Sequence, residues 1–241
     1  MRLKNKGIVI TGASRGLGAA LARKLSAEGA RLVLVARNAE PLDRIVEELR
    51  RGGGEAHGLA ADIGDKQAIH RLSGAAHGLL GTIEVLVHNA STLGPTPLRP
   101  LLDTECEDFG AVLETNLVGP FRLTKAIAGG MVLRGEGQVI HISSDAAVEA
   151  YPTWGAYSVA KAGLDHLNRI FAAELQASGV RFLSVDPGEM DTRMHAEAIP
   201  DADRSTLASP DEVAAQIASL LADPSIESGQ RVIAATAGRI S

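Results

Sequence analysis

A tyrosine and a lysine four residues apart, Tyr157 and Lys161, are the side chains of this sequence best placed for acid–base chemistry. Residues with this spacing are neighbours on one face of a helix. A phenol, with a pKa of about 10, is a poor proton donor or acceptor at neutral pH, and a nearby ammonium favours the phenolate and lowers that pKa. The pair could therefore give a proton to a carbonyl oxygen or remove one from an alcohol.

A serine in the same stretch strengthens this interpretation. Ser144 closes the apolar run QVIHISS, and Tyr157 follows at the start of the next helical pattern. Ligands of open α/β sheets bind at the carboxyl ends of the strands. A hydroxyl at that position can hold a substrate oxygen.

Three glycines follow the first apolar run of the chain, in the segment TGASRGLG at Gly12, Gly16 and Gly18. A glycine-rich loop between a strand and a helix lets a diphosphate approach the backbone, and the helix N-terminus favours its negative charge. The spacing differs from the strict dinucleotide fingerprint, because three residues separate the first two glycines. The loop is a candidate dinucleotide site, with a plain strand-to-helix connection as the alternative.

The same letters allow a second chemistry. Gly12 to Gly16 also reads G-x-S-x-G, the nucleophile elbow of serine hydrolases, with Ser14 as the nucleophile. In that fold the oxyanion loop precedes the elbow, and an acid and then a histidine follow on later strand ends. Only one strand candidate precedes Ser14, so the hydrolase is the less favoured alternative.

The end of the second apolar run bears on the choice of nucleotide. An NAD site usually places Asp or Glu there to hold the ribose hydroxyls. This chain has Arg37 at that position, and Arg15 lies in the glycine loop. Two guanidinium groups would attract a 2′-phosphate. We therefore expect NADP(H) rather than NAD(H), with two solvated surface arginines as the alternative.

Short apolar runs alternate with helical patterns along the whole chain. The strand candidates are residues 7–11, 31–36, 84–90, 138–143, 180–186 and 231–235, with a weaker one near 55–60. Continuous apolar runs are typical of strands that are buried on both faces of a parallel sheet. The order predicts a doubly wound, Rossmann-type α/β fold with a parallel sheet of about seven strands and helices on both faces.

Composition limits the other possibilities. The 241 residues carry 24 Lys and Arg against 29 Asp and Glu, and they show no basic stripe for a nucleic acid or an anionic membrane. The N-terminal apolar run is too short for a signal peptide or a membrane span. The single cysteine, Cys106, excludes an internal disulfide and a multi-thiolate metal site. We expect one domain over residues 1–241, a cytoplasmic location and no metal.

Taken together, these motifs resemble the compact, single-domain type of short-chain dehydrogenase/reductase, from residue 5 to about residue 235. TGASRGLG matches the TGxxxGxG loop of that family. Asn116 in ETNLVGPF, Ser144, Tyr157 and Lys161 match its active-site asparagine, serine, tyrosine and lysine. The segment HNAS fits the family's NNAG only in part, because His88 replaces an asparagine and a serine replaces the glycine.

The resemblance implies a nicotinamide cofactor and a catalytic tetrad. We expect cofactor contacts from Gly12, Ser14, Arg15, Gly16, Leu17, Gly18, Arg37, Asp62, Ile63, Asn89, Ala90, Tyr157, Lys161, Pro187, Gly188, Met190 and Thr192. Tyr157 would be the general acid or base, Lys161 would lower its pKa and bind the ribose, and Ser144 would orient the carbonyl. Asn116 would hold a water in the proton path. The implied activity is NADP(H)-linked oxidation or reduction at CH–OH groups, with a non-catalytic NADP(H) sensor or scaffold as the alternative.

Substrate identity is not encoded in these motifs. From position alone, residues 192–209 are expected to form a lid over the substrate. That segment includes Met194, His195, Ile199 and Pro200, and the residues expected near the pocket are Leu93, Asp145, Tyr151, Trp154 and Glu189. Every aromatic ring with a polar group falls within the seven residues from Tyr151 to Tyr157. We expect a small-molecule carbonyl or alcohol substrate and a homodimer or homotetramer built through the helices that begin near residues 104 and 155.

Overall fold

Seven parallel strands form one sheet in the order β3-β2-β1-β4-β5-β6-β7, in a computed structural model that describes residues 3–234. The strands are β1 Gly7–Thr11, β2 Arg31–Ala36, β3 Ala56–Ala60, β4 Val85–His88, β5 Gly137–Ile142, β6 Val180–Asp186 and β7 Arg231–Ile233. The central strands are buried along their whole length, as their continuous apolar sequences predict. The predicted α/β fold is confirmed.

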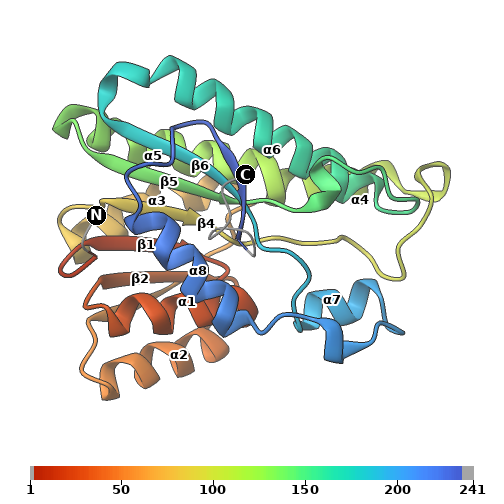
Figure 1. Ribbon diagram of the computed structural model, residues 1–241, viewed down its shortest axis with the longest axis horizontal. Helices are drawn as coiled ribbons and strands as arrows, with labels where there is room; N and C mark the ends of the chain where they lie inside the picture. Colours follow the sequence, from red (N-terminus) through yellow and green to blue (C-terminus); the bar gives the residue numbers. More distant parts are fainter. Residues whose placement is uncertain (1–2, 235–241) are drawn as a thin grey trace.

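Six helices cover the two faces of the sheet (Figure 1). One face packs against α1 Gly16–Ala27, α2 Ala39–Arg51 and α8 Pro210–Ala222, and the other against α3 Lys66–Leu80, α5 Gly119–Arg134 and α6 Gly155–Glu174. Within residues 3–234, no helix has both the length and the apolar character needed to cross a bilayer.

Two shorter helices lie at one end of the molecule, beyond the carboxyl ends of the strands (Figure 1). They are α4, Cys106–Leu113, which contacts α6, and α7, Arg193–Ala198. The Thr192 hydroxyl caps α7 by accepting a hydrogen bond from the backbone N–H of His195 at 3.2 Å. The predicted lid segment, 192–209, therefore contains a short helix and a single 3₁₀ turn, Arg204–Thr206.

The strand order reverses between β1 and β4, which are neighbours although two strands separate them in sequence. At such a reversal, the loops after adjacent strands diverge to opposite faces and leave a crevice. The glycine loop follows β1, and the segment beginning at Asn89 follows β4. The fold thus places the candidate dinucleotide loop at the position where an open α/β sheet binds ligands.

Candidate active site

Tyr157 and Lys161 lie one turn apart near the start of α6, and both are buried. The Lys161 Nζ atom is 5.5 Å from the centroid of the Tyr157 ring. The same ammonium donates a hydrogen bond to the backbone carbonyl of Ile142, at the end of β5, at 2.6 Å. Lys161 therefore joins the helix that carries the tyrosine to the strand that leads to Ser144.

Burial, rather than the lysine, dominates the acidity of the tyrosine. Burial raises the pKa of Tyr157 to about 12, while hydrogen bonding with the Ser144 and Ser91 hydroxyls acts to lower it. Burial also lowers the pKa of Lys161 to about 8, against the nearby carboxylates of Asp165 and Asp186. The sequence predicts a lowered pKa for Tyr157, and the structure gives the opposite direction. Burial takes the side chain out of water, which disfavours the charged phenolate. Burial therefore favours the neutral form of the Tyr157 phenol.

Ser144 follows β5 and lies beside the phenol of Tyr157. Its hydroxyl donates to Asp145 Oδ1 at 2.9 Å and accepts from the backbone N–H of Ala146 at 3.2 Å. The other oxygen of Asp145 accepts a hydrogen bond from the Tyr151 hydroxyl at 2.9 Å. The structure therefore brings Ser144 and Tyr157 together, and the single hydroxyl proton of Ser144 is directed to Asp145.

Asn116 lies in a π-helical turn, Glu114–Val118, that joins α4 to α5. Its amide oxygen accepts hydrogen bonds from Thr92 N at 2.8 Å and Ser91 Oγ at 3.2 Å, and its amide nitrogen donates to Thr92 O at 2.8 Å. Interruptions of this kind in a helix often mark functional sites. Asn116 fixes Ser91, and Ser91 in turn contacts the Tyr157 hydroxyl.

The glycine loop is tied to the segment after β4. The Asn89 amide donates to the backbone carbonyls of Thr11 and Gly12 at 3.0 and 3.1 Å, and the Thr11 hydroxyl accepts from the N–H groups of Asn89 and Ala90. A Cβ atom at Gly18 would collide with the Gly12 carbonyl and with the Asn89 amide, 2.5 Å away. The two predicted cofactor segments are thus in contact, with glycine required at their junction.

Across the crevice, the glycine loop faces the segment after β6. A Cβ atom at Gly16 would lie 3.6 Å from Thr192 Cγ2, and Gly16 has a positive φ of 53°. Asp186 Oδ1 accepts from the N–H of Gly188 at 2.9 Å and shapes the turn that follows β6. The loop therefore presents backbone without a side chain at Gly16, between the N-terminus of α1 and this turn. Such a surface fits a dinucleotide diphosphate.

The remaining predicted cofactor residues lie along the same edge of the sheet. Arg37 and Asp62 follow β2 and β3, whose ends pair at Ala36 and Ala60. Arg15 and Arg37 are exposed, and within the described chain neither guanidinium makes an ion pair or a hydrogen bond. Asp62 accepts from Gly64 N at 2.9 Å. The other predicted contacts include the buried Leu17, Ile63 and Pro187 and the half-buried Ser14, Ala90 and Met190.

A cavity of about 240 Å³ opens beside Tyr157. Its lining includes Leu93, Ser144, Asp145, Tyr151, Trp154, Pro187, Gly188, Glu189, Met190, Thr192, Met194, His195 and Ile199. The lining contains all five residues predicted near the pocket and three of the four residues named in the predicted lid segment. Pro200 is exposed and is not part of the lining.

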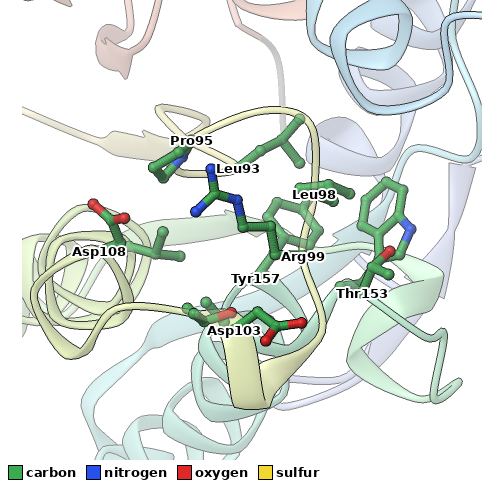
Figure 2. Close-up of a pocket in the computed structure, with 12 residues that line it drawn as sticks. Leu93, Pro95, Leu98, Arg99, Asp103, Asp108, Thr153 and Tyr157 are labelled. Atoms are coloured by element: carbon green, nitrogen blue, oxygen red, sulfur yellow. The ribbon is translucent and has the colours of Figure 1, made fainter.

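A second cavity, of about 40 Å³, lies on the other side of Leu93, Trp154 and Tyr157, which line both. Figure 2 shows Tyr157 at its back and Arg99 reaching across it, with Asp108 of α4 on one side. The wall between the two cavities is therefore thin and largely apolar. Within the described residues, no group of three or more histidine, cysteine and acidic side chains could hold a metal ion.

A largely buried row of polar side chains, with a 26% exposed arginine at its end, was not predicted. His88 of β4, His141 of β5, Ser184 of β6 and Arg231 of β7 are register neighbours across the sheet. The two histidine rings stack at 5.0 Å, with 7° between their planes. In the sequence, the available signal for this row was a single histidine inside each of two apolar strand candidates, His88 in 84–90 and His141 in 138–143.

Helices α5 and α6 supply partners for this row. Thr124 Oγ1 lies 2.8 Å from His88 Nε2, and Asn168 Oδ1 lies 3.1 Å from His141 Nδ1. Arg231 binds Asp165 at 3.1 Å and Asp186 at 2.8 Å, and it also donates to the Ser144 carbonyl. Because Asp165 and Asn168 follow Lys161 on the same face of α6, their spacing of four and seven residues was a usable signal.

The chain is similar to known proteins along most of its length. Residues 6–203 match the family model described as short chain dehydrogenase. The 3-oxoacyl-[acyl-carrier-protein] reductase of a Synechocystis species is 35% identical over 222 residues, which are 90% of this chain and 89% of that protein.

Two solved structures show the same fold with nicotinamide cofactors bound. A metagenomic short-chain oxidoreductase in complex with NADP has a TM-score of 0.83 and 33% identity, covering 97% of this chain and 98% of its own. A 7α-hydroxysteroid dehydrogenase in complex with NADH has a TM-score of 0.87 and 28% identity, covering 96% and 93%. Similar chains thus bind either nucleotide.

Proposed function

We propose that this chain, which belongs to the short chain dehydrogenase family, is an NADP(H)-dependent oxidoreductase that interconverts a carbonyl compound and its alcohol. The observation that carries the proposal is the convergence of Ser144, Tyr157 and Lys161 beside one cavity, next to a loop that fits a dinucleotide. A protein that only binds NADP(H) has no need for a buried phenol beside an ammonium and a serine hydroxyl.

In the reductive direction, the bound nicotinamide supplies the hydride that the carbonyl carbon receives. Tyr157 donates its phenolic proton to the carbonyl oxygen, which the Ser144 hydroxyl holds by a hydrogen bond. The phenolate left behind is stabilised by the Lys161 ammonium and by the Ser91 hydroxyl, which Asn116 holds in place. Oxidation of an alcohol runs through the same groups in reverse.

The geometry supports a cofactor site in which two segments, one on each side of the crevice, bind different parts of the dinucleotide. The glycine loop from Gly12 to Gly18 and the turn at Gly188 would hold the diphosphate and the nicotinamide half. Asp62 would meet the adenine, and Lys161 would meet the nicotinamide ribose. Arg15 and Arg37 would bind the 2′-phosphate, since both are exposed and the end of β2 offers no carboxylate.

The test is turnover of a panel of ketones and alcohols followed by NADPH absorbance, with NADH in parallel. We expect kcat/KM at least about tenfold higher with NADPH, because two charge-assisted hydrogen bonds are lost with NADH. Tyr157→Phe should lose roughly 10²- to 10⁴-fold in kcat and keep NADPH binding, measured by nucleotide fluorescence. A variant that kept most of its turnover would contradict the assignment, and NADPH binding without turnover by the wild type would favour the sensor.

We further expect a homo-oligomer in the cytoplasm. The exposed faces of α5 and α6 carry Phe121, Val159 and Ile170, apolar side chains between 40% and 48% exposed, which a partner subunit could cover. The single thiol, Cys106, is exposed and unpaired, which is compatible with a reducing compartment. Light scattering would give the assembled mass.

A further inference from the structure

The side chains around the reacting position form a closed ring of contacts. Ser144 hydrogen bonds to Asp145, and Asp145 hydrogen bonds to the Tyr151 hydroxyl. The Tyr151 and Trp154 rings meet edge to face at 6.5 Å, and the Trp154 and Tyr157 rings do so at 5.6 Å. The Tyr157 phenol completes the ring because it lies beside the Ser144 hydroxyl. Asp145 is the only charged member of this ring.

Asp145 also accepts the hydrogen bond that the Ser144 hydroxyl would have to donate to a substrate carbonyl. A serine hydroxyl has one hydrogen to donate and two lone pairs. The Ser144 hydrogen is directed at Asp145 Oδ1, and one lone pair accepts from Ala146 N. A carbonyl oxygen must therefore draw this hydrogen away from Asp145. The exchange leaves the carboxylate in place beside the substrate, still bound by Ala146 N and by Tyr151.

The charged side chains that line the cavity are mainly acidic. Two carboxylates, Asp145 and Glu189, border the cavity, and its lining includes neither lysine nor arginine. His195 is the one basic side chain there, and its Nε2 atom lies 3.7 Å from Glu189 Oε1. Most of the remaining wall is apolar, and Leu93, Trp154 and Met194 pack in one cluster with Tyr157 there. The smaller cavity contains Arg99, but Asp103 and Asp108 accompany it.

We propose that Asp145 determines substrate charge, so that the site reduces uncharged ketones with an apolar substituent and rejects oxo acids whose carboxylate lies next to the reacting carbonyl. This inference rests on the proposed function and narrows its substrate class. A carboxylate one or two carbons from the carbonyl would lie close to Asp145, with no cation in the lining to compensate. Like charges brought together at a binding site discriminate against the wrong partner.

The test offers 2-oxo and 3-oxo acids to the full-length protein with NADPH, each as the free carboxylate and as its ethyl ester. The two members of a pair share the reacting ketone and differ in charge. We expect kcat/KM for the ester to exceed that for the acid by about tenfold or more. In Asp145→Asn, which keeps the shape and loses the charge, this ratio should fall by about tenfold.

The matched control is Glu149→Gln, which removes one negative charge from the same loop at an exposed position outside the cavity lining. Its ester-to-acid ratio should equal that of the wild type. Equal turnover of acid and ester by the wild type, or an unchanged ratio in Asp145→Asn, would overturn the inference. So would failure of every ester while other ketones are reduced. Absence of turnover with every carbonyl tested would instead reject the proposed function.

Discussion

Two sets of polar side chains flank Tyr157 and Lys161, and they differ in what surrounds them. On the cavity side, Ser144, Asp145 and Tyr151 are half-buried or exposed, and they hydrogen bond mainly to one another. On the sheet side, the row from His88 to Arg231 lies between the sheet and helices α5 and α6. Groups on the first side can exchange partners with water or substrate. The buried His88, His141 and Ser184 on the second side have no such replacement.

The sheet side is also balanced in charge. Two carboxylates, Asp165 and Asp186, face two cations, Lys161 and Arg231. Burial lowers the pKa of Lys161 to about 8, and the two carboxylates act against this effect. Without them, a fully buried ammonium would be harder to keep charged. The comparison leads us to expect that substitutions on the cavity side change the rate, whereas substitutions on the sheet side change folding stability and the charge of the lysine.

Arg231→Met should give the largest effect, mainly as a loss of folding stability. The change removes the partner of Asp165 and Asp186, whose side chains are only 11% and 5% exposed. Leaving a buried charge unpaired costs roughly 3 to 5 kcal/mol. Urea denaturation would measure the free energy of unfolding.

Arg231→Lys is the matched control for that variant. It keeps the positive charge and loses the planar fork that binds both carboxylates, so a smaller loss is expected. If Arg231→Met folded with wild-type stability and lost its activity instead, the division between the two sides would be wrong.

Ser144→Ala should give the converse result. Loss of a hydrogen-bond donor to the reacting oxygen typically costs about 10²- to 10³-fold in kcat. Stability should change by less than about 1 kcal/mol, because the position is half-buried and Asp145 Oδ1 also accepts from Ala146 N. Steady-state kinetics and urea denaturation of the same preparation would check both halves. A loss of stability as large as that of Arg231→Met would remove the distinction.

The sheet and the glycine loop could be predicted because local sequence determines them. Continuous apolar runs gave the strands, and 7–11, 31–36 and 180–186 coincide with β1, β2 and β6. The loop after β1 needs glycine at Gly12 and Gly18 for reasons of space that leave a direct trace in the sequence. The candidate tetrad, by contrast, was identified through resemblance as well as spacing.

The protonation states and the buried row could not be predicted, because they depend on contacts between distant segments. The spacing of Tyr157 and Lys161 predicts a lowered phenol pKa, but the burial of Tyr157 raises it. His88 meets His141 only because β4 and β5 pair in one particular register. Arg231 reaches Asp165 across 66 residues of sequence. Local patterns mark the histidines in the strand candidates and the face of α6 that carries Asp165 and Asn168, but they do not show which distant segments meet.

Acid should weaken the protein through the sheet side, with the smallest of the three effects. Burial lowers the pKa of His141 to about 4 and that of His88 well below its ordinary value of about 6.5. Between about pH 6.5 and 4, the unfolded chain binds protons that the folded chain does not. The stabilisation is therefore complete above about pH 6.5 and is lost as the pH falls towards 4, by roughly 2 to 3 kcal/mol for His141.

His88→Asn isolates one of the two groups. Urea denaturation at several pH values should show a shallower fall in stability for this variant, by about one proton, or about 1.4 kcal/mol per pH unit. His70→Asn, at an exposed position on α3, is the control and should follow the wild type. Parallel pH profiles for all three proteins would mean that the stacked histidines exchange protons freely in the folded state. The sheet side would then be as adaptable as the cavity side, which the stacked, buried geometry of the pair argues against.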